Sequence, residues 1–383
     1  MTTAGTPARR RVLEVIDSLH VGGAERVVLH LSAAIDRERF DTAVCCTKFR
    51  GILATQATDA GVQVFDISNN RGLRRYTVPW RLLTLLREWR PDVVHTHGAA
   101  ALLHVGPLAL AGLLPPWVHT FHFGNYPHLP ARTLKAERFF GSLANVLVAV
   151  SQAQRRAIAQ AYGWPEERLR VVLNGVAARA ASAPASEARQ ALLGGDGGGT
   201  LERAPREGLL VGTVAVLSEQ KGIGYLLEAI SALRQRHETM RFAIIGGGPM
   251  EENLRRESAS LGIADVVTFT GWRTDALDLL PLLDVFVMPS LWEAMPMVLL
   301  EAMAAQRPIV VSDVGDNARI VEDGVSGLLI PARNAAAIVD AVDRLATDPS
   351  ERQRLGNAAR ERFEARFTVD RMVRDYESVL SAV

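Results

Sequence analysis

The sequence contains very little cysteine and no long stretch of uncharged apolar residues. Its two cysteines, Cys45 and Cys46, are neighbours in a predicted strand, so their side chains point to opposite faces and form neither a disulfide nor a metal pair. Buried free thiols are typical of a reducing compartment. The richest apolar stretch, 98–118, contains a histidine and three prolines, and the polar N-terminus ends in three arginines. Neither resembles a membrane span or a signal peptide, so we expect a cytoplasmic protein.

The sequence also lacks an excess of charge of either sign. Its 43 Lys and Arg residues stand against 42 Asp and Glu residues, for a net charge of +1. This balance argues against a dedicated nucleic-acid binder. However, residues 1–175 carry 21 basic and 13 acidic residues, a net of +8, while the remainder carries 22 and 29, a net of −7. The basic half is therefore expected to attract an anionic acceptor or the inner face of an anionic membrane, as a peripheral contact.

No Asp-x-Asp pair occurs in the sequence, which counts against a carboxylate-bound Mg²⁺ or Mn²⁺ on a nucleotide diphosphate. Histidines gather between His95 and His122, at the ends of predicted strands, but no carboxylate or thiol is spaced beside them as a further ligand. We therefore expect no metal site. Positive charge on a bound phosphate must then come from Lys, Arg and helix N-termini.

Short apolar runs alternate with helical segments along most of the chain. Strands are predicted at 12–16, 42–46, 92–95, 118–121, 146–150, 209–217, 242–245, 266–270, 285–288, 309–312 and 327–330. Helices are predicted at 25–35 and 78–89 in the first half. This alternation predicts an α/β fold of two doubly wound domains with a ligand cleft between them. Residues 177–208, rich in Ala, Ser, Pro and Gly, are predicted to be a linker with one short helix near 186–193.

Two glutamates eight residues apart, Glu293 and Glu301, give the strongest local signal. Glu293 follows a predicted strand on a loop, and Pro296 suits the first turn of a helix that would contain Glu301. The backbone N–H groups of Met297 and Val298 in that turn would form an anion site. The alternative is that both glutamates are merely solvated, which the apolar residues between them make less plausible.

Glycine turns add weaker signals for phosphate binding. Lys221 lies at a strand-to-helix junction, where a lysine can neutralise a diphosphate, although Lys-Gly turns are also common on surfaces. The turns at 246–248 and 22–23 could let backbone approach a ligand closely, or they are only tight turns. The third glycine of a dinucleotide fingerprint is absent after Gly23, so a nicotinamide dehydrogenase is disfavoured.

In their order and spacing, these motifs resemble the retaining glycosyltransferases of family 4 (glycosyl transferases group 1). The resemblance extends from residue 12 to about residue 380 and implies the GT-B fold, in which two Rossmann-like doubly wound domains face each other across an interdomain cleft. The motifs that carry it are GGAE at 22–25, PDVVHTHG at 91–98, TFH at 120–122, VAVS at 148–151, NGV at 174–176, QKG at 220–222, GGGP at 246–249, FTG at 269–271, the Glu293/Glu301 pair and EDGVSG at 322–327.

The resemblance assigns a role to each part of the chain. Residues 1–176 would form the acceptor domain and 209–365 the nucleotide-sugar donor domain, joined by the flexible linker 177–208. Residues 366–383 would form a C-terminal helix that packs back toward the N-terminal domain. The implied enzyme is a metal-independent, hexosyltransferase-like glycosyltransferase that retains anomeric configuration. Its co-substrate is a nucleoside-diphosphate sugar, and its acceptor is a glycan, a lipid-linked sugar or a small molecule, without a further cofactor.

The resemblance also implies three catalytic residues: His122 beside the transferred sugar, Lys221 on the diphosphate leaving group, and Glu293 on the sugar itself. Glu301 would hold the ribose hydroxyls. The donor-binding residues expected overall are Gly22, Gly23, Gly248, Trp272, Arg273, Met297, Val298 and Glu301.

The sequence departs from the family pattern at several of these positions. Val216 stands where the family usually has an arginine, so one of two cations on the diphosphate is missing. Ala294 and Met295 replace the usual Gly-Phe after the first glutamate. One hypothesis is that Arg319 or Arg273 supplies the missing charge. The departures also support an alternative function, in which a catalytically weak or silent GT-B module binds a nucleotide sugar or a protein partner.

Six arginines are interleaved with tryptophans and leucines between residues 71 and 90. One interpretation is a basic amphipathic element that contacts anionic lipid. The other, which we favour because the segment lies between two predicted strands, is an ordinary helix that packs its leucines on the sheet and leaves its arginines in water.

Overall fold

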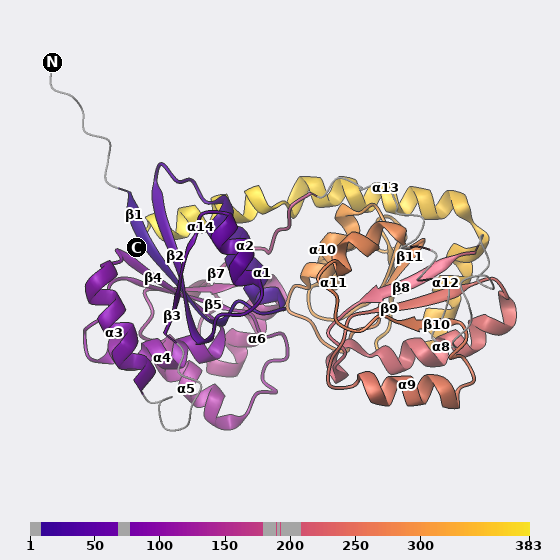
Figure 1. The fold of residues 1–383 in the computed structure, drawn as a ribbon, viewed down its shortest axis with the longest axis horizontal. Helices are drawn as coiled ribbons and strands as arrows, with labels where there is room; N and C mark the ends of the chain where they lie inside the picture. Colours follow the sequence, from indigo (N-terminus) through magenta and orange to yellow (C-terminus); the bar gives the residue numbers. More distant parts are fainter. Residues whose placement is uncertain (1–8, 68–76, 179–188, 190–191, 193–207) are drawn as a thin grey trace, which may run out of the picture. The chain divides into compact units, whose positions relative to one another are not determined.

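The protein is described by a computed structural model that covers residues 9–67, 77–178, 189, 192 and 208–383 (Figure 1). It forms two compact units. The first comprises Met1–Gly175 together with Val369–Val383, and the second comprises Val176–Thr368. Each unit is a parallel sheet covered by helices, so the two doubly wound domains predicted from the sequence are confirmed.

The first unit contains a seven-stranded parallel sheet in the order β3-β2-β1-β4-β5-β6-β7. Its strands are β1 (Arg10–Ser18), β2 (Phe40–Phe49), β3 (Gln63–Asp66), β4 (Val93–His97), β5 (Trp117–Phe121), β6 (Val146–Ala149) and β7 (Leu169–Val171). The strand order reverses between β1 and β4, and at such a switch point the loops after neighbouring strands diverge and leave room for a ligand.

Helices cover both faces of this sheet. They are α1 (Gly23–Ala34), α2 (Leu53–Asp59), α3 (Val78–Trp89), α4 (Gly98–Leu110), α5 (Ala131–Gly141), α6 (Gln152–Tyr162) and α14 (Val369–Ser381), with a short 3₁₀ turn η2 (Glu166–Arg168). One buried cluster joins the sheet to α3, α4 and α6, and a second joins it to α1 and α2. Cys45 belongs to the first cluster and Cys46 to the second, so the two thiols do point to opposite faces.

The second unit contains a six-stranded parallel sheet in the order β10-β9-β8-β11-β12-β13. Its strands are β8 (Leu210–Val214), β9 (Arg241–Ile245), β10 (Val267–Phe269), β11 (Val285–Met288), β12 (Ile309–Ser312) and β13 (Leu328–Ile330). Its helices are α8 (Ile223–Arg236), α9 (Glu251–Ser260), α10 (Met297–Ala304), α11 (Asn317–Ile320), α12 (Ala335–Thr347) and α13 (Pro349–Arg366), with 3₁₀ turns η4 (Glu219–Lys221) and η5 (Ala276–Leu282). The switch point lies between β8 and β11.

The last helix, α14, belongs to the first unit although it follows the whole second unit in sequence. It packs against α1. Its Glu377 carboxylate accepts a hydrogen bond from the backbone N–H of Asp36 at 2.9 Å and forms an ion pair with Arg39 at 3.0 Å. The chain therefore crosses between the units twice, once after Gly175 and once before Val369.

Most of the predicted linker 177–208, including most of its short predicted helix, lies outside the described residues. Arg189 is an exception. Its guanidinium donates to the backbone carbonyls of Leu282 and Gly208 and forms a 2.7 Å ion pair with Asp284. At this residue the segment is attached to the second unit.

The helix predicted at 78–89 is present as α3, and its leucines are buried in the core cluster against the sheet. This confirms the structural interpretation of its apolar residues. Its outward face carries Trp80, which is 71% exposed, together with Arg81 and Arg87, while Arg71, Arg74 and Arg75 lie outside the described residues. Among the helices that the structure describes, none has the length and apolar character needed to cross a membrane.

Candidate active site

In the second unit, Lys221 and Glu293 meet at the switch point of the sheet. Lys221 ends the turn η4 that follows β8, and Glu293 lies on the loop after β11. Because β8 and β11 are paired neighbours, these loops start side by side. Lys221 Nζ lies 2.6 Å from Glu293 Oε1, and their side chains are 17% and 5% exposed. The two residues expected on the diphosphate and on the sugar are thus in direct contact.

Two further side chains hold the Glu293 carboxylate in place. Ser290 Oγ donates to Oε1 at 2.7 Å, and Gln220 Nε2 donates to Oε2 at 3.2 Å and to the Trp292 carbonyl at 2.9 Å. Sequence reasoning assigned no role to Ser290 or Gln220. Gln220 adjoins Lys221 and Ser290 lies on the same short loop as Glu293, so their proximity in sequence was the available signal.

Glycines bring the two loops into contact. Gly222 has φ +61°, and a Cβ atom there would lie 2.2 Å from the Pro289 carbonyl oxygen. Gly315 has φ +60°, and a Cβ atom there would lie 2.2 Å from the Glu293 carbonyl oxygen. Both positions need a residue without a side chain, because of the left-handed backbone and because of the close approach. The Glu293 loop is therefore held from two sides by backbone contacts.

Helix α10 begins at Met297, so Pro296 is its N-cap residue and not part of the first turn as predicted, while Glu301 lies inside the helix as expected. Met297 and Val298 are its first two residues, so their N–H groups precede the intrahelical hydrogen bonds. Ala294 and Met295, which replace the usual Gly-Phe, are buried. The loop accommodates them by turning their side chains inward.

The glycine turn at 246–248, which was expected to approach a ligand or to be only a tight turn, lies against Trp272 and Leu217. Trp272 is 55% exposed, and its indole lies so close to Gly247 that a Cβ there would be 2.6 Å from Trp272 Cδ1. A Cβ on Gly248 would lie 2.5 Å from the Leu217 carbonyl oxygen. These glycines thus allow a close contact with other residues of the second unit. That contact is sufficient to explain why glycines stand in this turn, without a bound ligand.

Neither arginine considered as a substitute for the missing cation has an uncompensated charge. Arg273 forms a two-pronged ion pair with Asp275, at 2.8 and 2.6 Å, and Arg319 Nε lies 3.6 Å from Asp316 Oδ1. Each guanidinium is therefore offset by a carboxylate of its own neighbourhood.

In the first unit, Gly22 and Gly23 form the turn from β1 to α1, with Gly22 as the N-cap residue. A Cβ on Gly22 would lie 2.2 Å from Glu25 Oε2, so the Glu25 carboxylate folds back against the turn that was expected to approach phosphate. Burial raises the pKa of Glu25, with a smaller contribution from Asp17. A carboxylate in a first helical turn is the ordinary partner of a helix N-terminus.

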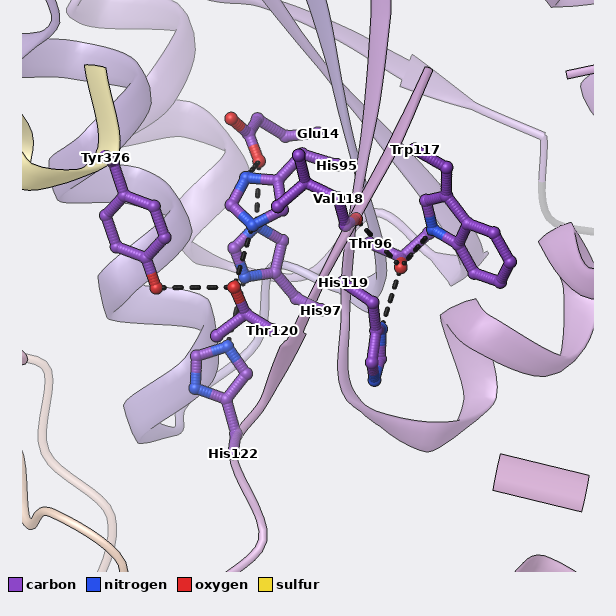
Figure 2. A network of polar contacts seen from close by, with 10 residues as sticks. All are labelled: Glu14, His95, Thr96, His97, Trp117, Val118, His119, Thr120, His122 and Tyr376. Carbon is purple, nitrogen blue, oxygen red and sulfur yellow. Dashed lines mark hydrogen bonds and ion pairs between the residues drawn. The ribbon is translucent and has the colours of Figure 1, made fainter. Parts of the chain in front are cut away.

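His122 follows β5 and belongs to a buried network that includes a carboxylate (Figure 2). His122 Nε2 lies 3.0 Å from His97 Nδ1, and His97 Nε2 lies 2.7 Å from Glu14 Oε2. The side chains of Glu14 and His97 have no exposed surface. Although burial raises the pKa of Glu14, His95 and His97 lower it to about 2. Burial, together with His95, lowers the pKa of His97 to about 4.

The expectation that no carboxylate lies near these histidines is wrong. Glu14 is in the middle of β1, and β1 pairs with β4 in a register that sets Glu14 opposite His95. His95 Nδ1 lies 2.8 Å from Glu14 Oε2, and Glu14, His95 and His97 have their ligand atoms within 4.8 Å of one another, close enough to hold a metal ion. Glu14 and His97 are 83 residues apart in sequence, so spacing could not reveal the cluster. The signal was a charged residue inside an otherwise apolar central strand.

The network continues through β5 to the last helix. Thr120 Oγ1 lies 2.8 Å from His95 Nε2 and 3.4 Å from the Tyr376 hydroxyl of α14. Thr96 of β4 makes similar contacts with the adjacent strand β5. Its Oγ1 accepts a hydrogen bond from Trp117 Nε1 and contacts His119 Nδ1, both at 2.8 Å. The histidines of β4 and β5 are thus joined to polar partners inside the core rather than left isolated.

Two family models match the chain. Residues 21–179 match Glycosyltransferase Family 4, and residues 202–362 match Glycosyl transferases group 1. The chain is also 32% identical over 325 residues, or 80% of each protein, to the GDP-mannose-dependent alpha-(1-6)-phosphatidylinositol monomannoside mannosyltransferase of Mycolicibacterium smegmatis. This chain belongs to glycosyltransferase family 4.

Other relatives of this family 4 glycosyltransferase act on different sugars. It is 26% identical, over 86% of each chain, to the UDP-Gal:alpha-D-GlcNAc-diphosphoundecaprenol alpha-1,3-galactosyltransferase of Escherichia coli. A shorter match, 34% identical over 153 residues, spans 39% of the alpha-D-kanosaminyltransferase of Streptomyces kanamyceticus.

Solved structures share the fold of this glycosyltransferase. Anabaena Alr3699/HepE in complex with UDP-glucose has a TM-score of 0.85 at 21% identity, covering 97% of this chain and 100% of that one. A glycosyltransferase from Rickettsia africae has a TM-score of 0.80 at 17% identity, covering 98% of both chains. At such low identity the likeness establishes the GT-B fold alone. Family and fold together confirm a glycosyltransferase that uses nucleotide sugars.

Proposed function

We propose that this family 4 glycosyltransferase transfers a hexose from a nucleoside-diphosphate sugar to a lipid-linked, glycan or small-molecule acceptor, with retained anomeric configuration and no metal. The observation that carries the proposal is the contact between Lys221 and Glu293 at the switch point of the second unit. The relatives from M. smegmatis and E. coli support it, because both names specify α-linked products and lipid-bound acceptors.

In this proposal the second unit binds the donor. Lys221 neutralises the diphosphate, where negative charge grows as the sugar leaves. The free N–H groups at the start of α10 bind phosphate oxygens, Glu301 binds the ribose, and Trp272 offers an exposed aromatic face to the base. Glu293, held by Ser290 and Gln220, faces the sugar. Lys221 places a positive charge directly beside the Glu293 carboxylate. This chain's own residues can therefore stabilise the leaving diphosphate.

A panel of nucleotide sugars tests donor binding by thermal shift. A ligand present at 100 times its dissociation constant stabilises the folded state by about 2.7 kcal/mol, which raises Tm by about 5–10 °C in a domain of roughly 150–250 residues. We expect one nucleoside-diphosphate sugar to give this shift with the native chain and a much smaller shift with Lys221→Ala. No shift with any nucleotide or nucleotide sugar would contradict the proposal.

We also propose that the first unit works at an anionic surface on the cytoplasmic side of a membrane. Residues 1–175 have a net charge of +8, and the outward face of α3 combines the exposed Trp80 with Arg81 and Arg87. Binding to vesicles that contain anionic lipid is expected to weaken strongly between 50 and about 300 mM salt, because the Debye length becomes shorter. A sedimentation assay measures this, with neutral vesicles as the control. Binding that ignores salt or lipid charge would exclude the electrostatic contact.

A further inference from the structure

We propose that Gln220 and Ser290 are positioning residues for sugar transfer. They orient the Glu293 carboxylate so that the protein occupies Oε1 completely, while Oε2 keeps one lone pair for a hydroxyl of the transferred sugar. This inference rests on the proposed function, because it assigns Glu293 to the sugar.

The backbone of the loop that carries Glu293 is fixed independently of its carboxylate. The Leu291 N–H donates to the Gln220 carbonyl at 2.7 Å. On the other side, the Glu293 carbonyl lies so close to Gly315 that a Cβ atom there would be 2.2 Å from its oxygen. Rotation of the Glu293 side chain about its own bonds is the freedom that remains, and only contacts with the carboxylate itself can remove it.

The lone pairs of the Glu293 carboxylate are unequally occupied. Each oxygen of a carboxylate has two acceptor sites, about four in all. Oε1 accepts from Ser290 Oγ at 2.7 Å and from Lys221 Nζ at 2.6 Å, so both of its sites are occupied. Oε2 accepts from Gln220 Nε2 at 3.2 Å and has no second donor within the described residues. The remaining site on Oε2 is therefore the one that a sugar hydroxyl can use.

The three side chains that bind this carboxylate differ in how firmly they are held. Lys221 has a flexible four-carbon stem and is partly exposed, and a bound diphosphate would attract its ammonium group. Ser290 is completely buried and lies on the same loop as Glu293. Gln220 Nε2 is anchored by a second hydrogen bond, to the Trp292 carbonyl at 2.9 Å. Ser290 and Gln220 therefore keep the carboxylate oriented while Lys221 neutralises the diphosphate.

The chemistry of an amide explains the choice of residue at Gln220. Its Nε2 faces two acceptors, the Trp292 carbonyl oxygen and Glu293 Oε2. An amide nitrogen has two N–H groups and satisfies both. Gln220→Met keeps the length of the side chain but removes the donors, whereas Gln220→Glu also places a second negative charge beside Glu293. The two variants therefore separate the loss of a donor from repulsion.

Steady-state kinetics of the full-length protein test these roles, with the nucleotide sugar that stabilises the native chain in the thermal-shift panel. We expect Ser290→Ala and Gln220→Met each to lower kcat by about 10- to 100-fold, since a misplacement of about 1 Å has an effect of this size. KM for the nucleotide sugar should change little, because Lys221 and the start of α10 are unaltered. Gln220→Glu should lose more than Gln220→Met. An unaltered kcat, or a loss confined to KM, would overturn the proposal.

Two variants of the same types are matched controls. Ser258 of α9 is also a buried serine of the second unit, and its hydroxyl has no hydrogen-bond partner in the described part of the chain. Gln235 is exposed on α8. Ser258→Ala and Gln235→Met should keep the native kcat and KM. Thermal unfolding of every variant identifies losses that come from unfolded protein, and the partly buried Gln220 keeps the test available if Ser290→Ala does not fold.

Analogues of the nucleotide sugar that each lack one hydroxyl test the role of Oε2. We expect the native chain to transfer one of these analogues more slowly than the complete sugar, because Oε2 then has no hydroxyl to bind. With that analogue, Gln220→Met should cause little further loss. If Gln220→Met caused the same further loss with every analogue as with the complete sugar, Oε2 would not be the atom that binds the sugar.

A double-mutant cycle separates positioning from a merely structural role. In the Glu293→Ala background, Ser290→Ala and Gln220→Met are expected to cause no further loss of kcat, because their effect passes through the carboxylate. Equal losses in both backgrounds would contradict this.

Transfer by the native chain is measured first. A native chain that transfers no sugar would remove the proposed function, and the assignment of Glu293 with it. Native transfer together with unaltered Ser290 and Gln220 variants would leave the proposed function standing and overturn only the two positioning roles.

Discussion

Replacing Lys221 with alanine is expected to lower kcat/KM for sugar transfer by about 100- to 1000-fold, the usual effect of removing one group that stabilises charge in a transition state. The loss should be large here because the chain has few alternatives. Val216 stands where the family usually has a second cation, and Arg273 and Arg319 are paired with Asp275 and Asp316. Lys221 is likewise paired with Glu293, but of these three cations it is the one that lies at the switch point of the second sheet, so it would be the principal cation on the leaving diphosphate.

The assay must distinguish lost chemistry from lost folding. Without Lys221, Glu293 keeps its bonds to Ser290 and Gln220 but loses its counter-charge, and breaking a buried ion pair can cost up to about 3–5 kcal/mol. The partial exposure of Lys221 makes that figure an upper bound. Initial rates of transfer and of donor hydrolysis should therefore be accompanied by thermal unfolding of each variant.

Two further variants make the Lys221 result specific. Lys221→Ala combined with Glu293→Gln removes the unpaired charge, so it should recover stability without recovering transfer. Lys135→Ala, a change of the same type on the exposed surface of α5, should leave both unaltered. Equal, background-level turnover by the native chain and Lys221→Ala would instead favour a silent module that only binds nucleotide sugar or a protein partner.

The first unit is expected to lose stability steeply as the pH falls from about 6.5 toward 4. Burial lowers the pKa values of His97, His119 and His122, so these histidines stay neutral in the folded protein. In the unfolded chain they bind protons below pH 6.5. The unfolded state therefore carries up to three more protons, which favours unfolding by about 3–4 kcal/mol for each pH unit.

Two carboxylates modify this slope in opposite directions. The pKa of Glu14 is lowered to about 2, so below pH 4.5 the unfolded state gains a further proton relative to the folded state and stability falls further. Burial raises the pKa of Glu137, which lets the folded state bind a proton first and offsets part of the loss near that pH. The net effect remains destabilising because the histidines are more numerous.

Urea unfolding at pH 7, 6 and 5 measures how the free energy of unfolding changes with pH. Hydrogen exchange in peptides from β4 and β5 serves as the readout, so that the measurement reports on the first unit. A His119→Phe variant should lower the slope by about one proton, since the His119 side chain is fully buried. A stability that is flat between pH 7 and 5 would show that the histidines are charged in the folded protein.

Local features of the sequence were sufficient to locate several elements. Strands β11 and β12 and helix α3 have the predicted bounds because each is a continuous or periodic apolar segment enclosed by prolines or charged residues. The start of α10 after Pro296, and with it the placement of Glu293 and Glu301, also follows from local rules. The order and spacing of residues alone are thus sufficient to infer the family and the two loops that carry Lys221 and Glu293.

The tertiary structure alone decided which distant residues meet. The pairing of β1 with β4 sets Glu14 against His95 and His97, and the return of α14 to the first unit brings Tyr376 to Thr120. It also showed that Arg273 and Arg319 are paired with local carboxylates. Periodicity reports which face of an element is buried, but strand order and helix docking depend on contacts between segments far apart in the chain. For that reason the sequence determined the family and the loop that carries Glu293, whereas the fold determined the partners of His122.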